Sequence, residues 1–535
     1  MKANPGQPFS LSQWKKRTSW SHGNVRKPLV THCAFGYYWD MNITSIYNDF
    51  EVCYRALCSR DARFDGRFFT AVTTTGIYCR PICPAPTPQA CHVRFYPCAA
   101  AAEAAGFRSC RRCHPEASPG SPDWNVRADL VARALRLVAD GVVDTEGISG
   151  LARRLAVSER HLHRELVAEV GIGPLELARS RRAQTARLLI DQTDLSLTTI
   201  AFTAGFASIR QFNDTMQAAF GCAPSAFRRR EPSVVGGNGH LTLRLPYRSP
   251  YDAASLLSFL GQRALPGIEE VSNGCYRRTI KLPHTSGIIE IEPVAEKSHL
   301  LLRLQLDDLR DLNLLVQRCR QLFDLDADPG AITDVLAADP LLAPLLSIRP
   351  GLRVPGAING FELAVRAILG QQVSVAGART LAGRLVKALG EPLSTPGGRL
   401  THLFPIPEAV SQADLQGLGI TQRRIDTIRL IAKNTVSGDL VLDRSADREQ
   451  TMKQLLALPG IGPWTVAYIA MRALGDPDAF PATDLGLRSA LSRHGRATDP
   501  RSVTAYAESW RPWRSYATIH LWTSLADAQG KQERY

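Results

Sequence analysis

The sequence predicts a multidomain protein of mixed fold class, in which small α+β units alternate with all-α units. Its 535 residues are enough for three to five domains. Nine of its twelve cysteines lie at or before Cys113, which favours a small metal-stapled unit near the start of the chain. Farther along, the apolar pattern changes from a helical period to strand alternation and back. These observations predict four folded domains of alternating class.

The composition is that of a globular protein with a basic charge. Hydrophobic residues make up 44% and charged residues 21%, and the net charge is +14. The first 126 residues alone hold 15 basic and 8 acidic groups. Such a balance suits a polyanionic partner, either nucleic acid or an anionic membrane surface. Because no apolar run approaches 18 residues, we expect no membrane partner.

Composition shifts and linkers give the expected domain boundaries. Residues 1–40 show neither a sustained period nor the apolar core of a secretion signal, so we expect a disordered leader on a cytoplasmic protein. A linker rich in Ser, Pro and Gly follows residue 114, and Gly236-Gly237 marks a second loop. From residue 310 onward the pattern is helical, with breaks at 392–398 and 405–407. The expected domains are 41–120 (α+β), 125–232 (all-α), 238–316 (α+β, with a helix near 251–262) and 317–530 (all-α).

The first all-α domain contains an internal repeat. Leu151-Ala152 matches Ile200-Ala201 at an offset of 49, and Gly171 matches Gly221 at an offset of 50. Each copy predicts a short helix, a tight turn and a longer amphipathic helix, as in a helix-turn-helix. Residues 125–230 resemble the DNA-binding domain of AraC-type regulators. A bundle of short helices without a ligand is the alternative.

That resemblance implies two recognition helices, at about 159–170 and 208–220, which would enter successive major grooves of double-stranded DNA. The expected DNA-facing side chains include Arg160, His163, Arg210 and Gln211.

Four cysteines have the spacing of a metal site. Cys79 and Cys83 form one close pair, and Cys110 and Cys113 form a second pair after 26 intervening residues. Two such pairs can close a tetrahedral Zn²⁺ site. From spacing alone, a purely structural zinc is the favoured interpretation.

The residues around these cysteines favour a reactive site. The segment 68–81 (FFTAVTTTGIYCRP) and the segment 105–113 (AGFRSCRRC) resemble the zinc domain of the adaptive-response protein Ada. The resemblance implies that all four cysteines bind one Zn²⁺ and that Cys79 also accepts a methyl group from a DNA methylphosphotriester. Zinc keeps a thiol as the nucleophilic thiolate. Methylation would remove one negative charge and favour binding to the phosphate backbone. No Pro-Cys-His-Arg segment occurs, so Ada's second transferase half is not expected.

A second motif lies in the C-terminal all-α domain. Residues 458–464 read Leu-Pro-Gly-Ile-Gly-Pro-Trp before a helical run, and Asp484 follows Gly462 by 22 residues. Gly460 and Gly462 allow backbone N–H groups to approach a phosphate at a helix N-terminus. This helix-hairpin-helix with its aspartate resembles the DNA glycosylase superfamily. Segments 364–374 and 510–517 point to its 3-methyladenine glycosylase II branch, AlkA, and the strand-rich segment resembles the N-terminal domain of that branch.

The glycosylase resemblance implies the roles of individual residues. Asp484 would be the catalytic carboxylate; its alternative is a helix N-cap. Three aromatic residues match the base pocket, with ordinary core packing as their alternative: Trp464, Tyr468 and Trp522. Gln372 stands where a relative places the apolar wedge that fills the gap left by a flipped base. Because related lyases carry Lys at the position of Trp464, we expect a monofunctional enzyme. No cysteine follows Cys319, which excludes a C-terminal iron–sulfur cluster.

Together these patterns predict a fused DNA-alkylation-repair and regulatory protein that excises alkylated purines and binds alkylated and promoter DNA. Further expectations are a monovalent cation at the helix-hairpin-helix, RNA polymerase as a partner, a monomeric state and association with the nucleoid. The alternative from another class is a damage-responsive transcription factor whose glycosylase half only binds DNA. An intact Asp484 beside aromatic residues favours the enzyme.

Overall fold

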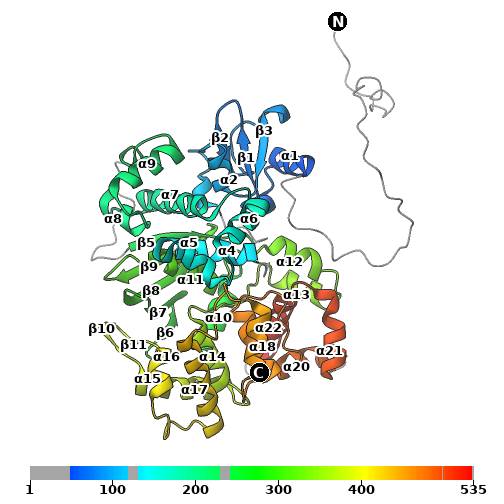
Figure 1. Ribbon diagram of the computed structural model, residues 1–535. Coiled ribbons are helices and arrows are strands. Elements are labelled where there is room, and N and C mark those ends of the chain that lie inside the picture. Colours follow the sequence, from blue (N-terminus) through cyan, green and yellow to red (C-terminus); the bar gives the residue numbers. More distant parts are fainter. Residues whose placement is uncertain (1–48, 119–129, 229–240, 497, 533–535) are drawn as a thin grey trace, which may run out of the picture. The chain divides into compact units, whose positions relative to one another are not determined.

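A computed structural model describes residues 49–118, 130–228, 241–496 and 498–532 (Figure 1). The leader expected at 1–40 lies outside these ranges. Within them, no helix combines the length and the apolar character needed to cross a membrane.

The first described domain is a four-stranded sheet with two helices. The strand order is β3-β1-β2-β4, antiparallel except for the parallel pair β2–β4. Cys79 is the last residue of β2 and Cys110 directly follows β4. Because Tyr78 pairs with Ser109 in the parallel register, both cysteines reach the same end of the sheet. The elements are α1 (Phe50–Ser59), β1 (Phe69–Val72), β2 (Ile77–Cys79), β3 (Val93–Tyr96), α2 (Ala99–Ala104) and β4 (Arg108–Ser109).

The second domain consists of helices that contain the sequence repeat. Ser158 Oγ caps α6 by accepting from His161 N–H at 3.2 Å, and Ser208 Oγ caps α9 in the same way. Leu162 and Phe212, one repeat apart, are both buried. The helices are α4 (Leu130–Ala139), α5 (Val142–Arg154), α6 (Glu159–Val170), α7 (Pro174–Gln192), α8 (Leu197–Thr203) and α9 (Ile209–Phe220). The two expected recognition helices therefore correspond to α6 and α9.

The third domain is a five-stranded antiparallel sheet of order β5-β9-β8-β7-β6, on which α10 packs. Its strands alternate between buried leucine or isoleucine and more exposed residues, as the sequence pattern predicts. The elements are β5 (Leu241–Pro246), α10 (Ala253–Gln262), β6 (Glu269–Ser272), β7 (Cys275–Lys281), β8 (Ser286–Pro293) and β9 (His299–Leu306). The next helix, α11 (Leu312–Leu322), spans the boundary expected between residues 316 and 317.

In the described residues from 323 onward, the secondary structure is helical apart from one hairpin. The break expected at 392–398 is built as two strands, β10 (Pro392–Gly397) and β11 (Leu400–His402), which the helical pattern did not predict. A bridge between Gly267 and Leu400 joins this hairpin to the segment before β6. The helices are α12 (Pro329–Leu336), α13 (Leu342–Ile348), α14 (Gly360–Leu369), α15 (Val375–Leu389), α16 (Pro407–Gln412), α17 (Gln422–Ser437), α18 (Arg448–Ala457), α19 (Pro463–Arg472), α20 (Leu485–Arg493), α21 (Pro500–Tyr506) and α22 (Arg514–Gln532).

Candidate functional sites

The four predicted cysteine ligands form one cluster. The Sγ atoms of Cys79, Cys83, Cys110 and Cys113 all lie within 4.8 Å of one another, and those of Cys83 and Cys110 are 4.0 Å apart. Zn–S bonds of about 2.3 Å in a tetrahedron place sulfur atoms about 3.8 Å apart. The donor set and its dimensions therefore fit one Zn²⁺.

The four sulfur atoms differ in the backbone hydrogen bonds that they accept. Arg80 N–H donates to Cys113 Sγ and Arg112 N–H donates to Cys110 Sγ, both at 3.4 Å. Within the described ranges, no backbone N–H donates to Cys79 Sγ. Since a donated hydrogen bond withdraws charge from sulfur, Cys79 keeps more electron density than Cys110 or Cys113. All four cysteines are largely buried, with exposed fractions between 5% and 9%.

The residues expected to face DNA lie on the two recognition helices. Arg160 and His163 are exposed on α6, and Arg210 is exposed on α9, 3.9 Å from Asp214. Gln211 is half-buried, and its Oε1 accepts a hydrogen bond from Ala207 N–H at 3.1 Å. The side-chain oxygen of Gln211 therefore accepts a hydrogen bond within the turn, and a contact with DNA would use its side-chain NH₂ group as a donor.

The predicted catalytic aspartate accepts three hydrogen bonds. Asp484 is the N-cap of α20, and its Oδ1 accepts from Leu487 N–H at 2.7 Å. Oδ1 also accepts from Trp522 Nε1, and Oδ2 accepts from Trp464 Nε1, both at 2.8 Å. The N-cap alternative is therefore correct as a description of the backbone, but it does not exclude a second role. The sequence did not predict the two indole contacts.

The three predicted pocket aromatics lie together beside this carboxylate. Trp464 and Tyr468, one turn apart on α19, stack with ring centroids 5.2 Å apart and planes at 14°. Trp522 from α22 lies 6.3 Å from Tyr468 in a tilted arrangement. All three side chains are only half-buried. Their partial exposure and their contact with Asp484 favour a pocket wall over ordinary core packing.

Arg472, which the sequence did not single out, anchors this wall. Its Nη1 donates to Tyr468 Oη at 2.6 Å, while its other nitrogens donate to the carbonyl oxygens of Pro355 and Gly356 at 2.8 and 3.0 Å. Burial acts to raise the pKa of Tyr468. The charges of Arg472, Arg263 and Arg366 outweigh burial, so this pKa lies below its usual value.

The glycine hairpin has the geometry that its motif predicts. Gly460 has φ +86°, and a Cβ atom there would lie 2.1 Å from Thr427 Oγ1, so no other residue fits. Gly462 is the N-cap residue of α19. Gln372 is exposed with φ +55°, directly after Gln371, whose backbone oxygen accepts from Arg424.

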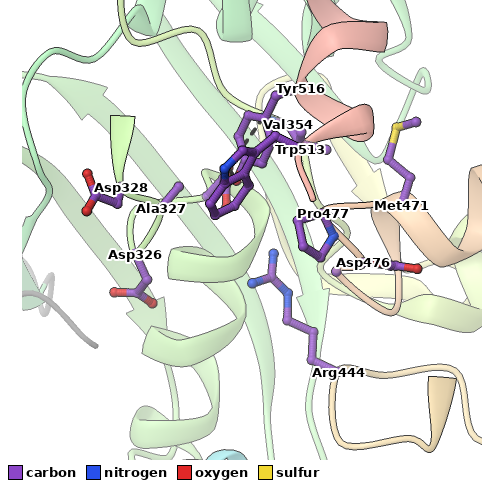
Figure 2. Close-up of a pocket in the computed structure, with 12 residues that line it drawn as sticks. Asp326, Ala327, Asp328, Val354, Arg444, Met471, Asp476, Pro477, Trp513 and Tyr516 are labelled. Carbon is purple, nitrogen blue, oxygen red and sulfur yellow. Dashed lines mark hydrogen bonds between the residues drawn. The ribbon is translucent and has the colours of Figure 1, made fainter. Parts of the chain in front are cut away.

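A pocket of about 40 Å³ lies elsewhere in the C-terminal half (Figure 2). Asp484 is not among its lining residues. Asp326 and Asp328 lie on one side of it, and Pro477 and Met471 lie on the other. Trp464, Tyr468 and Trp522 do not line it either, so it is separate from the predicted base pocket.

Four family models match successive parts of the chain. They are the metal binding domain of Ada (residues 52–116), a helix-turn-helix domain (151–230), the AlkA N-terminal domain (242–359) and the HhH-GPD superfamily of base excision DNA repair proteins (365–515). Together with the observed helices and sheets, these matches confirm the predicted fold class of each domain.

Curated relatives match either nearly the whole chain or one part of it. The "Probable bifunctional transcriptional activator/DNA repair enzyme AlkA" of Mycobacterium tuberculosis is 51% identical over 484 residues, which cover 90% of this chain and 97% of the relative. "DNA-3-methyladenine glycosylase 2" of Escherichia coli is 33% identical over 52% of this chain and 95% of its own. The Escherichia coli "Bifunctional transcriptional activator/DNA repair enzyme Ada" is 34% identical over 33% of this chain and 48% of its own. By its identity and coverage, the chain belongs to the family of the bifunctional transcriptional activator/DNA repair enzyme AlkA.

Proposed function

We propose that this protein repairs alkylated DNA and regulates the response to alkylation, and that its C-terminal half hydrolyses the N-glycosidic bond of 3-methyladenine-type purines. The observation that carries the enzymatic part is the Asp484 carboxylate, held beside an aromatic wall by Trp464 and Trp522. A clamp that only binds DNA has no need of a fixed carboxylate next to such a wall.

The chemistry requires few groups from the protein. An N-alkylated purine such as 3-methyladenine already carries a positive charge and leaves readily, so no general acid is needed. As the bond breaks, positive charge develops on the sugar, and the Asp484 carboxylate stabilises it and positions the attacking water. The faces of Trp464, Tyr468 and Trp522 suit an electron-poor base that has been flipped out of the duplex.

The glycine hairpin would bind the phosphate backbone of the DNA. Backbone N–H groups near Gly460 and Gly462 precede α19, where the helix dipole favours a phosphate. A monovalent cation bound by this hairpin belongs to the same proposal. Gln372 would occupy the gap in the duplex, and Arg424 secures the loop that carries it.

The side chain at the lyase position supports a monofunctional enzyme. Trp464 stands there with an indole nitrogen that donates to Asp484, and an indole cannot form a Schiff base with an abasic sugar. Borohydride should therefore trap no covalent complex with an abasic intermediate.

We further propose that Cys79 accepts a methyl group from a methylphosphotriester in a single, stoichiometric event. The Cys79 sulfur attacks the methyl carbon, an S–C bond forms, and the C–O bond breaks with its electron pair leaving on the phosphodiester oxygen. Zinc bound by the four cysteines would keep their sulfur atoms as thiolates at neutral pH. The absence of a backbone N–H donor at Cys79 supports its choice over Cys110 and Cys113.

Methyl transfer would couple repair to regulation. Neutralising one thiolate changes the formal charge of a Zn(Cys)₄ centre from −2 to −1, which weakens its repulsion from DNA phosphates. The helices α6 and α9 would then bind promoter DNA, with Arg160, His163, Arg210 and Gln211 as contacts. RNA polymerase as a partner, a monomeric state, and a cytoplasmic, nucleoid-associated location complete the proposal.

The deciding experiment uses the full chain on DNA treated with a methylating agent. Chromatography of the released bases should show 3-methyladenine, with the phosphodiester backbone uncut. Stable binding of that DNA without any free base would favour the alternative, a regulator whose glycosylase half is only a clamp.

A further inference from the structure

The hydrogen bonds to Asp484 nearly exhaust its capacity as an acceptor. A carboxylate offers about four acceptor sites, two on each oxygen. Leu487 N–H and Trp522 Nε1 occupy both sites of Oδ1, and Trp464 Nε1 occupies one site of Oδ2. One site on Oδ2 therefore remains for a water molecule or for the sugar.

The donors come from three different helices and hold the carboxylate in one orientation. Leu487 belongs to α20, Trp464 to α19 and Trp522 to α22. The indole of Trp464 is itself held by its stack on Tyr468, and Arg472 ties Tyr468 to the backbone of residues 355 and 356. The carboxylate is thus oriented by a chain of contacts that begins in the protein backbone.

We propose that Trp464 and Trp522 are positioning residues for Asp484, in addition to lining the base pocket, and that their indole N–H groups fix the carboxylate against the reacting sugar. This inference rests on the proposed glycosylase function. Three donated hydrogen bonds, from Leu487, Trp522 and Trp464, hold the carboxylate in place. Asp484 then acts as a fixed anion, and the leaving group must bring its own activation, as a cationic alkylpurine does.

Gly486 offers an independent way to disturb the same arrangement. A Cβ atom at Gly486 would lie 3.1 Å from Asp484 Oδ1 and 3.5 Å from Trp522 Cδ1. A methyl group there would press on the Trp522–Asp484 pair while leaving every N–H donor in place. Because Gly486 lies within α20 and Ala favours helix, the helix itself should tolerate this change.

The test measures single-turnover base release by the full chain on duplex DNA containing one 3-methyladenine. Trp464→Phe and Trp522→Phe keep an aromatic face but remove one donor each. We expect each to lower the rate at saturating enzyme by on the order of 10-fold, the value of one hydrogen bond to a charged group. The enzyme concentration at half-saturation should change less than the rate. Gly486→Ala should also slow release, although it removes no N–H donor.

Trp510 provides the matched control. Its Nε1 donates to Asp339 Oδ2 at 2.7 Å in the interior of the same domain, so Trp510→Phe removes the same kind of bond from a carboxylate other than Asp484. It should lower the melting temperature and leave the single-turnover rate unchanged.

The possible outcomes separate the inference from the function on which it rests. If the wild-type chain releases no base, the proposed function fails. If the wild type is active and both tryptophan variants match its rate, the positioning roles are wrong and the function stands. A Trp510→Phe rate as low as theirs would also overturn the inference, because the loss would then follow stability.

Discussion

The side-chain amide of Gln371 donates a hydrogen bond of 3.0 Å to the backbone carbonyl oxygen of Gly460, and a second bond of 2.9 Å to Thr465 Oγ1. The loop before α15 is thereby joined to the glycine hairpin before α19. The next residue in this anchored loop, Gln372, is exposed and has a left-handed backbone conformation. Few residues other than Gly and Asn adopt that conformation without cost, which points to a function for the Gln372 side chain.

Replacing Gln372 with glycine removes the side chain and also relieves the cost of the left-handed backbone. The effect of the side chain on base release can therefore be measured without a loss of stability. Gln372→Gly relieves the positive φ, so the melting temperature should be unchanged or higher. If Gln372 fills the gap left by a flipped base, release of 3-methyladenine from a matched duplex should fall on the order of 10-fold. The defect should shrink when the lesion faces a mismatch, because less stacking is then lost on flipping.

The exposed residue Asn273, with φ +52° in the turn between β6 and β7, serves as the control. Asn273→Gly makes the same backbone change without removing a group from the proposed site. Equal base release by Gln372→Gly and by Asn273→Gly would eliminate the gap-filling role.

Asp484→Asn tests the catalytic carboxylate without removing the helix cap. Asparagine is also a good N-cap, so the contact with Leu487 N–H and the fold should be kept. The amide removes the negative charge and directs an N–H group toward one of the indole donors. Base release should fall by about 10²-fold or more, with binding of abasic DNA nearly unchanged.

Asp499 caps α21 through Ser502 N–H at 3.0 Å and makes a matched comparison for Asp484. Asp499→Asn should leave the rate of base release unaltered. Wild-type-like release of 3-methyladenine by Asp484→Asn would show that the carboxylate assignment is incorrect.

The lowered pKa of the buried side chain of His520 makes the stability of the fold depend on pH. Burial lowers its pKa from 6.5 to about 4; Arg349 acts in the same direction, and Asp252 opposes it. Between these values the unfolded chain binds a proton that the folded chain does not. Stability from this residue is therefore complete above pH 6.5 and is lost as the pH falls toward 4, by about 3 kcal/mol in all.

The slope of melting temperature against pH measures this linkage. His520→Gln should flatten the slope between pH 6.5 and 4, even if it lowers stability throughout. His494→Gln, at an exposed position, should leave the slope as in the wild type. Equal slopes for both variants would remove His520 as the source.

The sequence predicted those features that depend on local spacing. Cysteine pairs and a glycine hairpin are short motifs, so the sequence alone identifies Cys79 and Gly460. The repeat at offsets of 49 and 50 likewise predicted α6 and α9, because buried residues such as Leu162 and Phe212 recur at matching positions.

Other features could not be predicted, because they join residues that are distant in sequence. The indole bonds to Asp484 span 20 and 38 positions, and no local pattern specifies which N–H group meets a carboxylate. The sequence presents the N-cap and catalytic roles of Asp484 as alternatives, whereas in the structure Oδ1 caps the helix and Oδ2 keeps one acceptor site. The β10–β11 hairpin was missed because its Pro and Gly content is that of a loop.

Cys79→Ser tests the fusion of two activities in one chain. After incubation with methylated DNA, mass spectrometry of the wild type should find one extra methyl group, on the peptide that contains Cys79. The thioether has no route back, so the reaction should stop at one methyl group per protein. Binding to promoter DNA should tighten after methylation, because one negative charge is lost near the phosphates.

The Cys79→Ser variant should lose the methyl mark and keep Asp484-dependent base release, since the two sites belong to separate domains. Cys91→Ser, which removes an exposed thiol outside the cluster, should keep both. Zinc content measured on each variant distinguishes lost reactivity from a lost metal site. If the wild type carries the methyl group on Cys83, Cys110 or Cys113, or on no cysteine, the assignment of Cys79 as the acceptor is wrong. The cluster is then interpreted as a structural zinc site. That result does not depend on whether the serine variant folds.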